Sequence, residues 1–312
     1  MQTCTLAVDI GASSGRHIAG TVQNGKITLQ EVYRFENGVH RENGHLCWDI
    51  DTLAKEVVNG LKAAHDAGFA PATIGIDTWA VDFVLLDADN KRIGDAVAYR
   101  DERTEGIREA LEKGIRPDLC RPLCPHRHPV PAVQHGLPAD GAQKRSTRSS
   151  WPPPKTFLMV PDYLNYLLCG VPANEYTNAS TTALVGADSR DWDDALIEKL
   201  GLPRGIFQPI KTAGTVLGHL TPEIQKAVGF DAEVILPATH DTGSAFLAVP
   251  ARDEYAAYLS SGTWSLLGVE NAAAITGPDS CAANFTNEGG YEYRYRYLKN
   301  IMGPVDDPVR PP

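Results

Sequence analysis

The sequence has no long apolar run, no excess of basic residues and no basic segment followed by an apolar stretch at its N-terminus. A membrane-spanning helix needs about 18 or more apolar residues in succession, so we expect no membrane span. The 29 basic and 39 acidic side chains give a net charge of −10, and an acidic surface repels nucleic-acid phosphates. These absences predict a cytoplasmic protein that binds neither membranes nor nucleic acids.

Cysteine is also sparse, with six residues scattered along the chain. Their spread indicates reduced thiols and not a disulfide framework. Cys120 and Cys124 nevertheless stand close to His126 and His128, and thiolates beside imidazoles are the ligand set of a zinc site. A zinc-dependent interaction module is therefore one hypothesis for this chain, although it rests on residues 120–128 alone.

The first third of the chain alternates strand and helix patterns, which is typical of a mixed α/β fold. Gly11 and Gly15 permit positive φ in a tight turn between the first two strands. Asp51 predicts the N-cap of the first helix and Gly68 its C-terminal end. The expected elements are strands at 5–9, 17–22 and 27–35, a helix at 51–68, and a strand, a turn and a strand within 73–87.

A proline-rich segment interrupts this pattern, with nine prolines among the 38 residues from Pro117 to Pro154. A span of that length without periodicity is uncommon inside a compact domain. A serine- and glycine-rich turn near residue 262 resembles the turn after Asp9, which hints at two related lobes around one ligand. The later elements are expected as helices at 155–170, 195–200 and 221–229, a strand, turn and helix within 233–249, and a strand, turn and strand within 256–270.

The stretch DIGASSGR, from Asp9 to Arg16, has the composition of a phosphate-binding turn. Small residues let main-chain N–H groups approach a phosphate, hydroxyl groups add donors, and Asp9 at a strand end could hold Mg²⁺ through water. The stretch lacks the GK[ST] ending of a P-loop. Considered alone, it is better explained as a plain hairpin turn.

Two further stretches carry candidate chemistry. ATHDTGS, residues 238–244, follows an apolar strand, and ligands collect at the carboxyl ends of strands, so Asp241 is a candidate base for a substrate hydroxyl. The alternative is that Asp241 or Thr242 caps the following helix. DTWAVDF, residues 77–83, has the carboxylates and the aromatic ring of a sugar pocket, or it is a hairpin with a buried Trp79.

In their order along the chain, several stretches together resemble the rhamnulokinases of the FGGY carbohydrate kinase family. They are DIGASSGR, DTWAVDFVLLD, AYRDERT, MVPDYLNYLLCG, EYTNASTT, THDTGSA, YLSSGTWSLLG, TNEGG and RYLKNIMG. The resemblance covers residues 5–116 and 155–303. It implies an α/β fold of the actin-like, ribonuclease-H-like type, with a nearly complete N-terminal domain at 1–247 and a partial C-terminal domain at 248–312.

The resemblance also implies an activity and a set of site residues. The activity is phosphorylation of L-rhamnulose at its 1-hydroxyl by ATP and Mg²⁺, by a monomeric enzyme with Asp241 as the catalytic base. The family typically has glycine at position 80, so the methyl group of Ala80 is expected to crowd the sugar, and it usually differs from histidine at position 17. The implied substrate contacts are Ala80, His240, Asp241, Thr242 and Asn300, and the implied nucleotide contacts are Ser13, Ser14, Gly15, Arg16, His17 and Thr263.

Residues 119–154 have no counterpart in that family, which carries a stretch like GIQFQPFNT instead. GC-rich codons for that stretch, read two nucleotides further on, give HPVPAVQH, which is residues 128–135 here. Out-of-frame reading of the family's continuation also accounts for PVDDP at 304–308. We therefore expect one frame disturbance over about 119–154 and a second after Gly303.

Two consequences follow from these disturbances. The Cys/His cluster becomes a product of the wrong frame, and the first lobe and most of the second lobe lose segments that they need. The alternative function is then a catalytically dead fragment of the kinase that binds sugar weakly at most.

Overall fold

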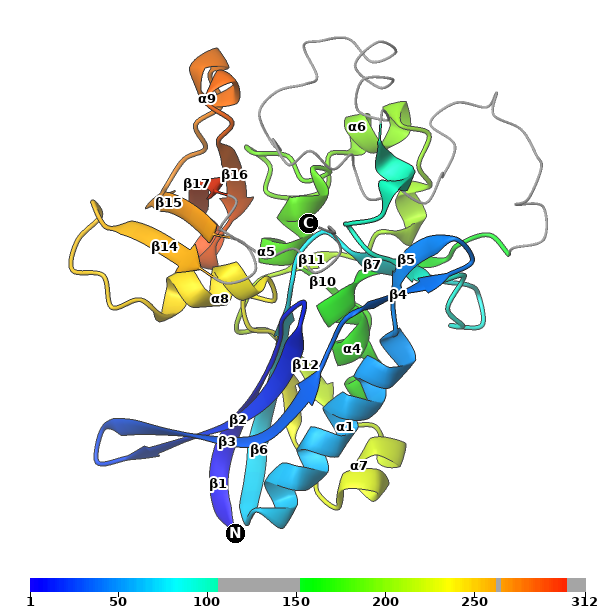
Figure 1. The fold of residues 1–312 in the computed structure, drawn as a ribbon, viewed down its shortest axis with the longest axis vertical. Coiled ribbons are helices and arrows are strands. Elements are labelled where there is room, and N and C mark those ends of the chain that lie inside the picture. The colour runs from blue at the N-terminus through cyan, green and yellow to red at the C-terminus, as the bar shows by residue number, and fades with distance from the viewer. Residues whose placement is uncertain (106–151, 262–264, 302–312) are drawn as a thin grey trace, which may run out of the picture.

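The computed structural model describes residues 1–105, 152–261 and 265–301, which form an α/β molecule built on two principal sheets (Figure 1). The strands of the larger sheet are β1 Gln2–Ile10, β2 Ser14–Gln23, β3 Lys26–Glu36, β6 Phe69–Thr78, β12 Val216–His219 and β13 Glu233–Ile235. Their order is β12-β13-β6-β1-β2-β3. β1 runs antiparallel to β2 and parallel to β6, and β6 runs parallel to β13. The carboxyl ends of β1, β6 and β13 therefore meet at one edge of the sheet.

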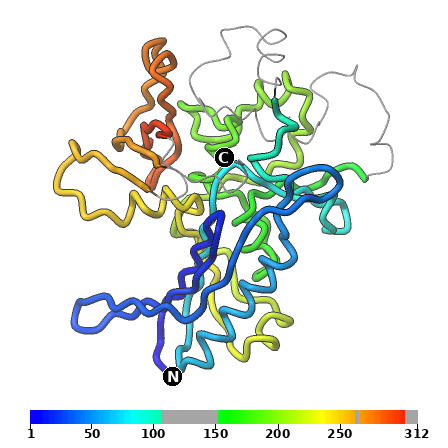
Figure 2. Tube along the Cα trace, viewed as in Figure 1, coloured from blue at the N-terminus to red at the C-terminus, as the bar shows by residue number. Residues whose placement is uncertain are grey.

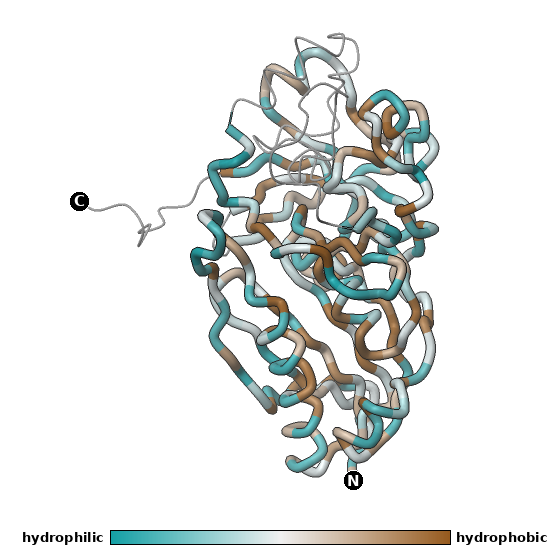
Figure 3. The backbone as a smooth tube through the Cα atoms, turned by 90° about the vertical axis from the view of Figure 1, so that its right-hand side faces the viewer, coloured by the Kyte–Doolittle hydropathy of each residue, from teal (hydrophilic) through white to brown (hydrophobic). Residues whose placement is uncertain are grey.

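Helices α1 Ile50–Asp66 and α4 Val160–Cys169 pack on this sheet, and α7 Pro222–Val228 packs against α1 (Figures 1 and 2). Alternate residues of β1 are buried, among them Val8 and Ile10, because successive side chains of a strand point to opposite faces. Figure 3 shows the apolar segments of the described chain in brown, and the buried apolar residues of β1, β6, α1 and α4 belong to one core cluster. Removal of this apolar surface from water is the main source of stability.

The second sheet follows the first through helix α8 Asp241–Ala248. Its strand order is β14-β15-β17-β16, and all of its pairs are antiparallel. Phe246 of α8 packs with Leu266 and Leu298 of the sheet, so α8 joins the two parts of the molecule. The strands are β14 Ala257–Ser261, β15 Ser265–Asn271, β16 Thr286–Gly289 and β17 Tyr295–Ile301.

Short elements complete the described chain. The remaining strands are β4 Val39–Glu42, β5 His45–Trp48, β7 Phe83–Leu86, β8 Ala96–Val97, β9 Thr156–Met159, β10 Asn174–Glu175 and β11 Ile210–Lys211. The remaining helices are α5 Tyr176–Ala179, α6 Asp194–Lys199 and α9 Pro278–Ala282, with 3₁₀ turns at Glu102–Thr104, Ser180–Thr182, Arg204–Ile206 and Tyr291–Tyr293. Among the described residues, no helix is long and apolar enough to cross a membrane.

Two sequence predictions about helices are wrong in detail. The N-cap of α1 is Asp49 and not Asp51, because the Asp49 carboxylate accepts a hydrogen bond from the Thr52 N–H at 2.9 Å. The helix predicted over 155–170 begins later, because residues 156–159 form β9 and pair with β7. A short apolar run does not distinguish a buried strand from a buried helix.

His17 of β2 lies in the core beneath α1. Its imidazole is fully buried, and its Nε2 atom lies 3.0 Å from the carbonyl oxygen of Val57. Burial lowers the pKa of His17 to about 4, so the ring is neutral at pH 7. The ring fits against the helix because position 60 is glycine, since a Cβ atom there would lie 2.2 Å from ring atoms of His17.

We predict that Gly60→Ala destabilises the protein by about 1–3 kcal/mol, because the added methyl group overpacks the His17 contact. Helix propensity alone predicts the opposite sign, since alanine is favoured over glycine by about 1 kcal/mol. Urea unfolding measures the change, with Lys62→Ala at an exposed position of α1 as the control. An unchanged or increased free energy of unfolding for Gly60→Ala would contradict this contact.

Candidate functional site

Three aspartates from separate segments converge where β1, β6 and β13 end. Asp9 and Asp77 are direct neighbours in the parallel register of β1 and β6. A bridge joins Thr78 to His240, and the Thr78 N–H donates to the carbonyl oxygen of Thr239 at 3.0 Å. This bridge brings Asp241, the first residue of α8, to the same edge of the sheet.

Two of these aspartates, Asp9 and Asp77, have a raised pKa. Burial, followed by the charges of Asp9 and Asp241, holds the pKa of Asp77 well above its usual range. Burial raises the pKa of Asp9 more than the Arg16 guanidinium, 3.3 Å away, lowers it, and Asp241 adds to the rise. Negative charge collected in this way is stabilised by a proton or by a bound cation.

The site fits a cation that is held through water. In the part of the chain that the structure describes, no group of three or more His, Cys, Asp or Glu side chains is arranged to ligate a metal ion. Mg²⁺ usually keeps several waters and takes one or two carboxylates together with substrate phosphates. Asp9 and Asp241 suit that mode, because their side chains remain 38% and 36% exposed.

The serine-glycine turn between β1 and β2 lies at this same edge. The Gly11 N–H donates to the carbonyl oxygen of Ser14 at 2.9 Å, and the Asn37 side-chain amide donates to the carbonyl oxygen of Gly11 at 2.8 Å. Glycine permits positive φ at positions 11 and 15, but neither residue adopts it. Gly15 is required by space instead, because a Cβ atom there would lie 2.1 Å from the Phe35 ring.

Not all of the expected nucleotide contacts lie at the turn. Ser13, Ser14 and Arg16 stand in or beside it, and Arg16 pairs with Asp9. The side chain of His17 points into the core beneath α1, so we withdraw its imidazole from the expected contacts. Thr263 and the cluster of Cys120, Cys124, His126 and His128 lie outside the described residues.

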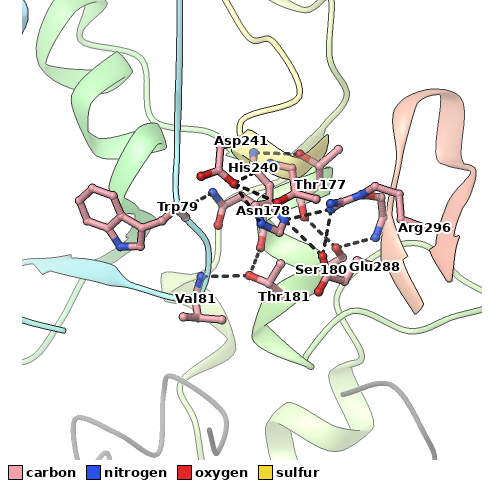
Figure 4. Close-up of polar contacts among 12 residues, drawn as sticks. Trp79, Val81, Thr177, Asn178, Ser180, Thr181, His240, Asp241, Glu288 and Arg296 are labelled. Atoms are coloured by element: carbon pink, nitrogen blue, oxygen red, sulfur yellow. Dashed lines mark hydrogen bonds and ion pairs between the residues drawn. The ribbon is translucent and has the colours of Figure 1, made fainter. Parts of the chain in front are cut away.

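A buried glutamate, to which the sequence pattern assigned no role, fastens two loops of the site together. The Glu175 carboxylate accepts hydrogen bonds from the N–H groups of Thr177 at 2.9 Å and of Thr239 at 3.0 Å. The Asn178 side-chain amide donates to the carbonyl oxygens of Trp79 and Thr239, both at 3.3 Å (Figure 4). The stretch EYTNASTT therefore holds the loop after β6 against the loop before α8.

Trp79 of DTWAVDF is buried, but the hairpin expected with it is wrong, because β6 and β7 do not pair and β7 pairs with β9. Trp79 packs on Trp48 with ring centroids 4.1 Å apart, and both indole N–H groups donate to the Asp82 carboxylate, at 2.9 and 2.6 Å. Neither ring is therefore available to pack on a sugar. Ala80 is half-buried, and Val81 next to it has a φ of 67°. Such a conformation is rare for a β-branched residue and clusters at functional sites.

The capping alternative for Asp241 and Thr242 is wrong, because the N-cap residue of α8 is His240 and no side chain caps this helix. Asp241 is the first helical residue and remains partly exposed, and its Oδ1 atom accepts a hydrogen bond from the Thr242 N–H at 2.6 Å. His240 stands between Asp241 and the second sheet, with its Nδ1 atom 3.0 Å from Nη2 of Arg296 (Figure 4). Asn300 follows Arg296 by four positions along β17, so the two side chains lie on the same face of the sheet.

Comparison with known proteins identifies the family to which this chain belongs. The N-terminal domain of the FGGY family of carbohydrate kinases matches residues 4–248. Proteins named rhamnulokinase from Oceanobacillus iheyensis and Halalkalibacterium halodurans are each 50% identical to this chain, over 97% and 96% of its length. The chain spans 64% and 63% of the lengths of these two relatives.

Solved structures agree on the fold. Ligand-bound xylulose kinase from Lactobacillus acidophilus superposes with a TM-score of 0.81 at 16% identity, over 95% of this chain and 59% of that one. Glycerol kinase from Plasmodium falciparum with ADP gives 0.75 at 13% identity, over 97% of this chain and 62% of that one. The chain belongs to the FGGY family of carbohydrate kinases, and the actin-like, ribonuclease-H-like fold expected from its motifs is confirmed. The resemblance of those motifs to the rhamnulokinases is confirmed as well.

We predict that Asp82→Asn flattens the dependence of stability on pH. Burial raises the pKa of Asp82 to about 7, against the hydrogen bonds from Trp48, Trp79 and the Tyr99 N–H. The folded state therefore holds a proton that the unfolded chain, with a carboxyl pKa of about 4, has released. The stability contributed by Asp82 is present at low pH and is lost as the pH rises through about 7.

Urea unfolding at pH 5, 6, 7 and 8 checks this prediction. The parent should lose stability with rising pH more steeply than Asp82→Asn, by at most about 1.4 kcal/mol per pH unit. Asp89→Asn, on an exposed loop, is the control and should follow the parent. Parallel curves for the parent and Asp82→Asn would show that Asp82 does not titrate in this range.

Proposed function

We propose that this chain carries the sugar-phosphorylating site of a kinase that transfers the γ-phosphoryl group of ATP to the 1-hydroxyl of L-rhamnulose. The observation that carries the proposal is the meeting of Asp241, Asp9 and the serine-glycine turn at one sheet edge. The names of the relatives at 50% identity support L-rhamnulose as the substrate.

Asp241 is the proposed catalytic base. Its carboxylate takes the proton of the sugar 1-hydroxyl, the hydroxyl oxygen forms a bond to the γ-phosphorus, and the bond from phosphorus to the bridging oxygen of ADP breaks. Phosphoryl transfer asks for positioning and charge neutralisation more than for covalent chemistry. A partly exposed carboxylate at the start of a helix can reach a substrate hydroxyl, which suits this role.

The other proposed contacts divide between nucleotide and sugar. Main-chain and hydroxyl groups of Ser13, Ser14 and Gly15 and the guanidinium of Arg16 face the phosphates, with Thr263 as a further contact. Bound Mg²⁺ supplies neutralisation of the phosphate charge, and Asp9 is its proposed water-mediated partner. The proposed sugar contacts, besides Asp241, are Ala80, His240, Thr242 and Asn300.

The division into domains is part of this proposal. Residues 1–247 form the N-terminal domain of the kinase, and residues 248–312 open its C-terminal domain. The second sheet, which is built from residues 257–301, supports this boundary. A cytoplasmic, monomeric protein stays a prediction.

A second candidate is a fragment that binds L-rhamnulose without turning it over. It is favoured by one observation, which is that the chain spans less than two thirds of the rhamnulokinases that it matches. The frame disturbances at about 119–154 and after Gly303 fall largely outside the described residues and remain a prediction. Sequencing of the coding DNA in all three frames tests them, and an intact frame that encodes this chain would remove them.

We predict that Asp241→Asn lowers ADP release with L-rhamnulose by about 10²–10⁴-fold, because the base is lost while the shape of the site is kept. A coupled ADP-release assay measures turnover, and calorimetry measures sugar binding, which should change little. Asp188→Asn, at an exposed loop position, is the control. Undiminished turnover in Asp241→Asn would reject Asp241 as the base, and sugar binding by the parent without any turnover would favour the second candidate.

A further inference from the structure

Arg296 is an unusual residue for the centre of this molecule. Its side chain is 0% exposed, and it is the largest fully buried side chain of the described chain. A buried charge is costly unless it is paired and hydrogen-bonded. Arg296 on β17 stands directly opposite Glu288 on β16, and its Nη2 atom lies 3.3 Å from Glu288 Oε2.

The guanidinium reaches out of the second sheet to the loop that carries the proposed base. Arg296 Nη2 lies 3.0 Å from Nδ1 of His240, and Arg296 Nε donates to the carbonyl oxygen of Gly289 at 2.9 Å (Figure 4). Its guanidinium carbon also lies 6.0 Å from the centre of the Phe246 ring on α8. The same strand end is anchored again, because the Gly289 N–H donates to the Ser180 hydroxyl at 2.8 Å.

The contact between Arg296 and His240 determines which ring nitrogen of His240 carries the proton. Every N–H of a guanidinium donates and none accepts, so the Nδ1 atom of a neutral His240 must be the acceptor. The proton of the imidazole then resides on Nε2, which lies 3.5 Å from Oδ1 of Asp241. Glu288 Oε2 lies 3.3 Å from the same Nδ1 atom and would select the opposite tautomer if Arg296 were absent.

We propose that Arg296 is a positioning residue which holds His240 in its Nε2–H tautomer and so orients the Asp241 carboxylate from the second sheet. Nε2 lies 3.5 Å from Oδ1, within reach of an electrostatic contact, and Oδ1 also accepts a hydrogen bond from the Thr242 N–H at 2.6 Å. This leaves the other oxygen, Oδ2, to receive the proton of a substrate hydroxyl. The catalytic part of this inference rests on the proposed function, whereas the tautomer does not.

A movement of the second sheet relative to the first is thereby linked to the base. Glu288 and Arg296 come from the second sheet, while His240 and Asp241 follow the last parallel strand of the first. Because β16 and β17 pair within one sheet, a shift of that sheet carries Arg296 and Glu288 away from His240 together. Nδ1 then loses the donor that selects the Nε2–H tautomer.

The test is the tautomer of His240 in protein with ¹⁵N-labelled histidine, read from its ring-nitrogen shifts near neutral pH. The signals are assigned by their loss in His240→Gln. The parent is expected to show the Nε2–H form, and Arg296→Met is expected to lose that signal and gain the Nδ1–H form. Arg294→Met is the matched control, because Arg294 pairs with Glu270 at 3.0 Å on the same segment, and its spectrum should match the parent.

Each outcome bears on the proposal. An Nδ1–H form in the parent overturns it without any variant, which decides the matter even if Arg296→Met does not fold. An unchanged Nε2–H signal in folded Arg296→Met overturns it as well. Where turnover is present, Arg296→Lys should lower kcat about tenfold or more with little change in the KM for L-rhamnulose. The expected tautomers without turnover would leave this inference standing and reject the proposed activity.

Discussion

The collection of acidic side chains at one edge of a mixed sheet, where the parallel strands β1, β6 and β13 end, is the constraint on which the rest of this structure depends. Parallel pairing of β1 with β6 makes Asp9 and Asp77 neighbours, and the bridge from Thr78 to His240 brings Asp241 to them. Water is partly excluded there, so burial and the neighbouring charges raise the pKa of Asp77, and burial followed by the charge of Asp241 raises the pKa of Asp9. A phosphoryl-transfer site uses that arrangement, because a cation and a substrate proton both relieve the repulsion.

Buried polar groups hold this edge in place from outside the sheet. Glu175 fastens the loop before α8, and Asp82 fastens the loop after β6 through two indole N–H groups. Arg296 reaches the same place from the second sheet. Removal of one partner from such a network leaves a desolvated charge or donor, which makes the geometry specific. The strained φ of Val81 is held by the same surroundings, because its N–H donates to Thr181.

The sequence predicted the parts of the site that local rules control. Alternation in β1, the small-residue turn after Asp9 and the position of Asp241 between a buried strand and a helix were all readable, because each depends on residues close in the chain. The family resemblance added the fold, which the solved structures confirm. The roles of Glu175, Asp82 and Arg296 were not readable, since their partners lie 64, 34 and 56 residues away. The burial of the His17 side chain was not readable either, because it depends on Gly60 of α1, which lies far from His17 in the sequence.

The most direct test of the central claim is whether the turn at 13–16 and the loop at 239–242 share one site. Mn²⁺ with ADP broadens the NMR signals of nearby amides in isotope-labelled protein. The account predicts that the amides of Ser13 to Arg16 and those of Thr239 to Thr242 broaden together, while the amides of α7 do not. Broadening confined to one of the two stretches, or spread over acidic surface residues alone, would contradict it.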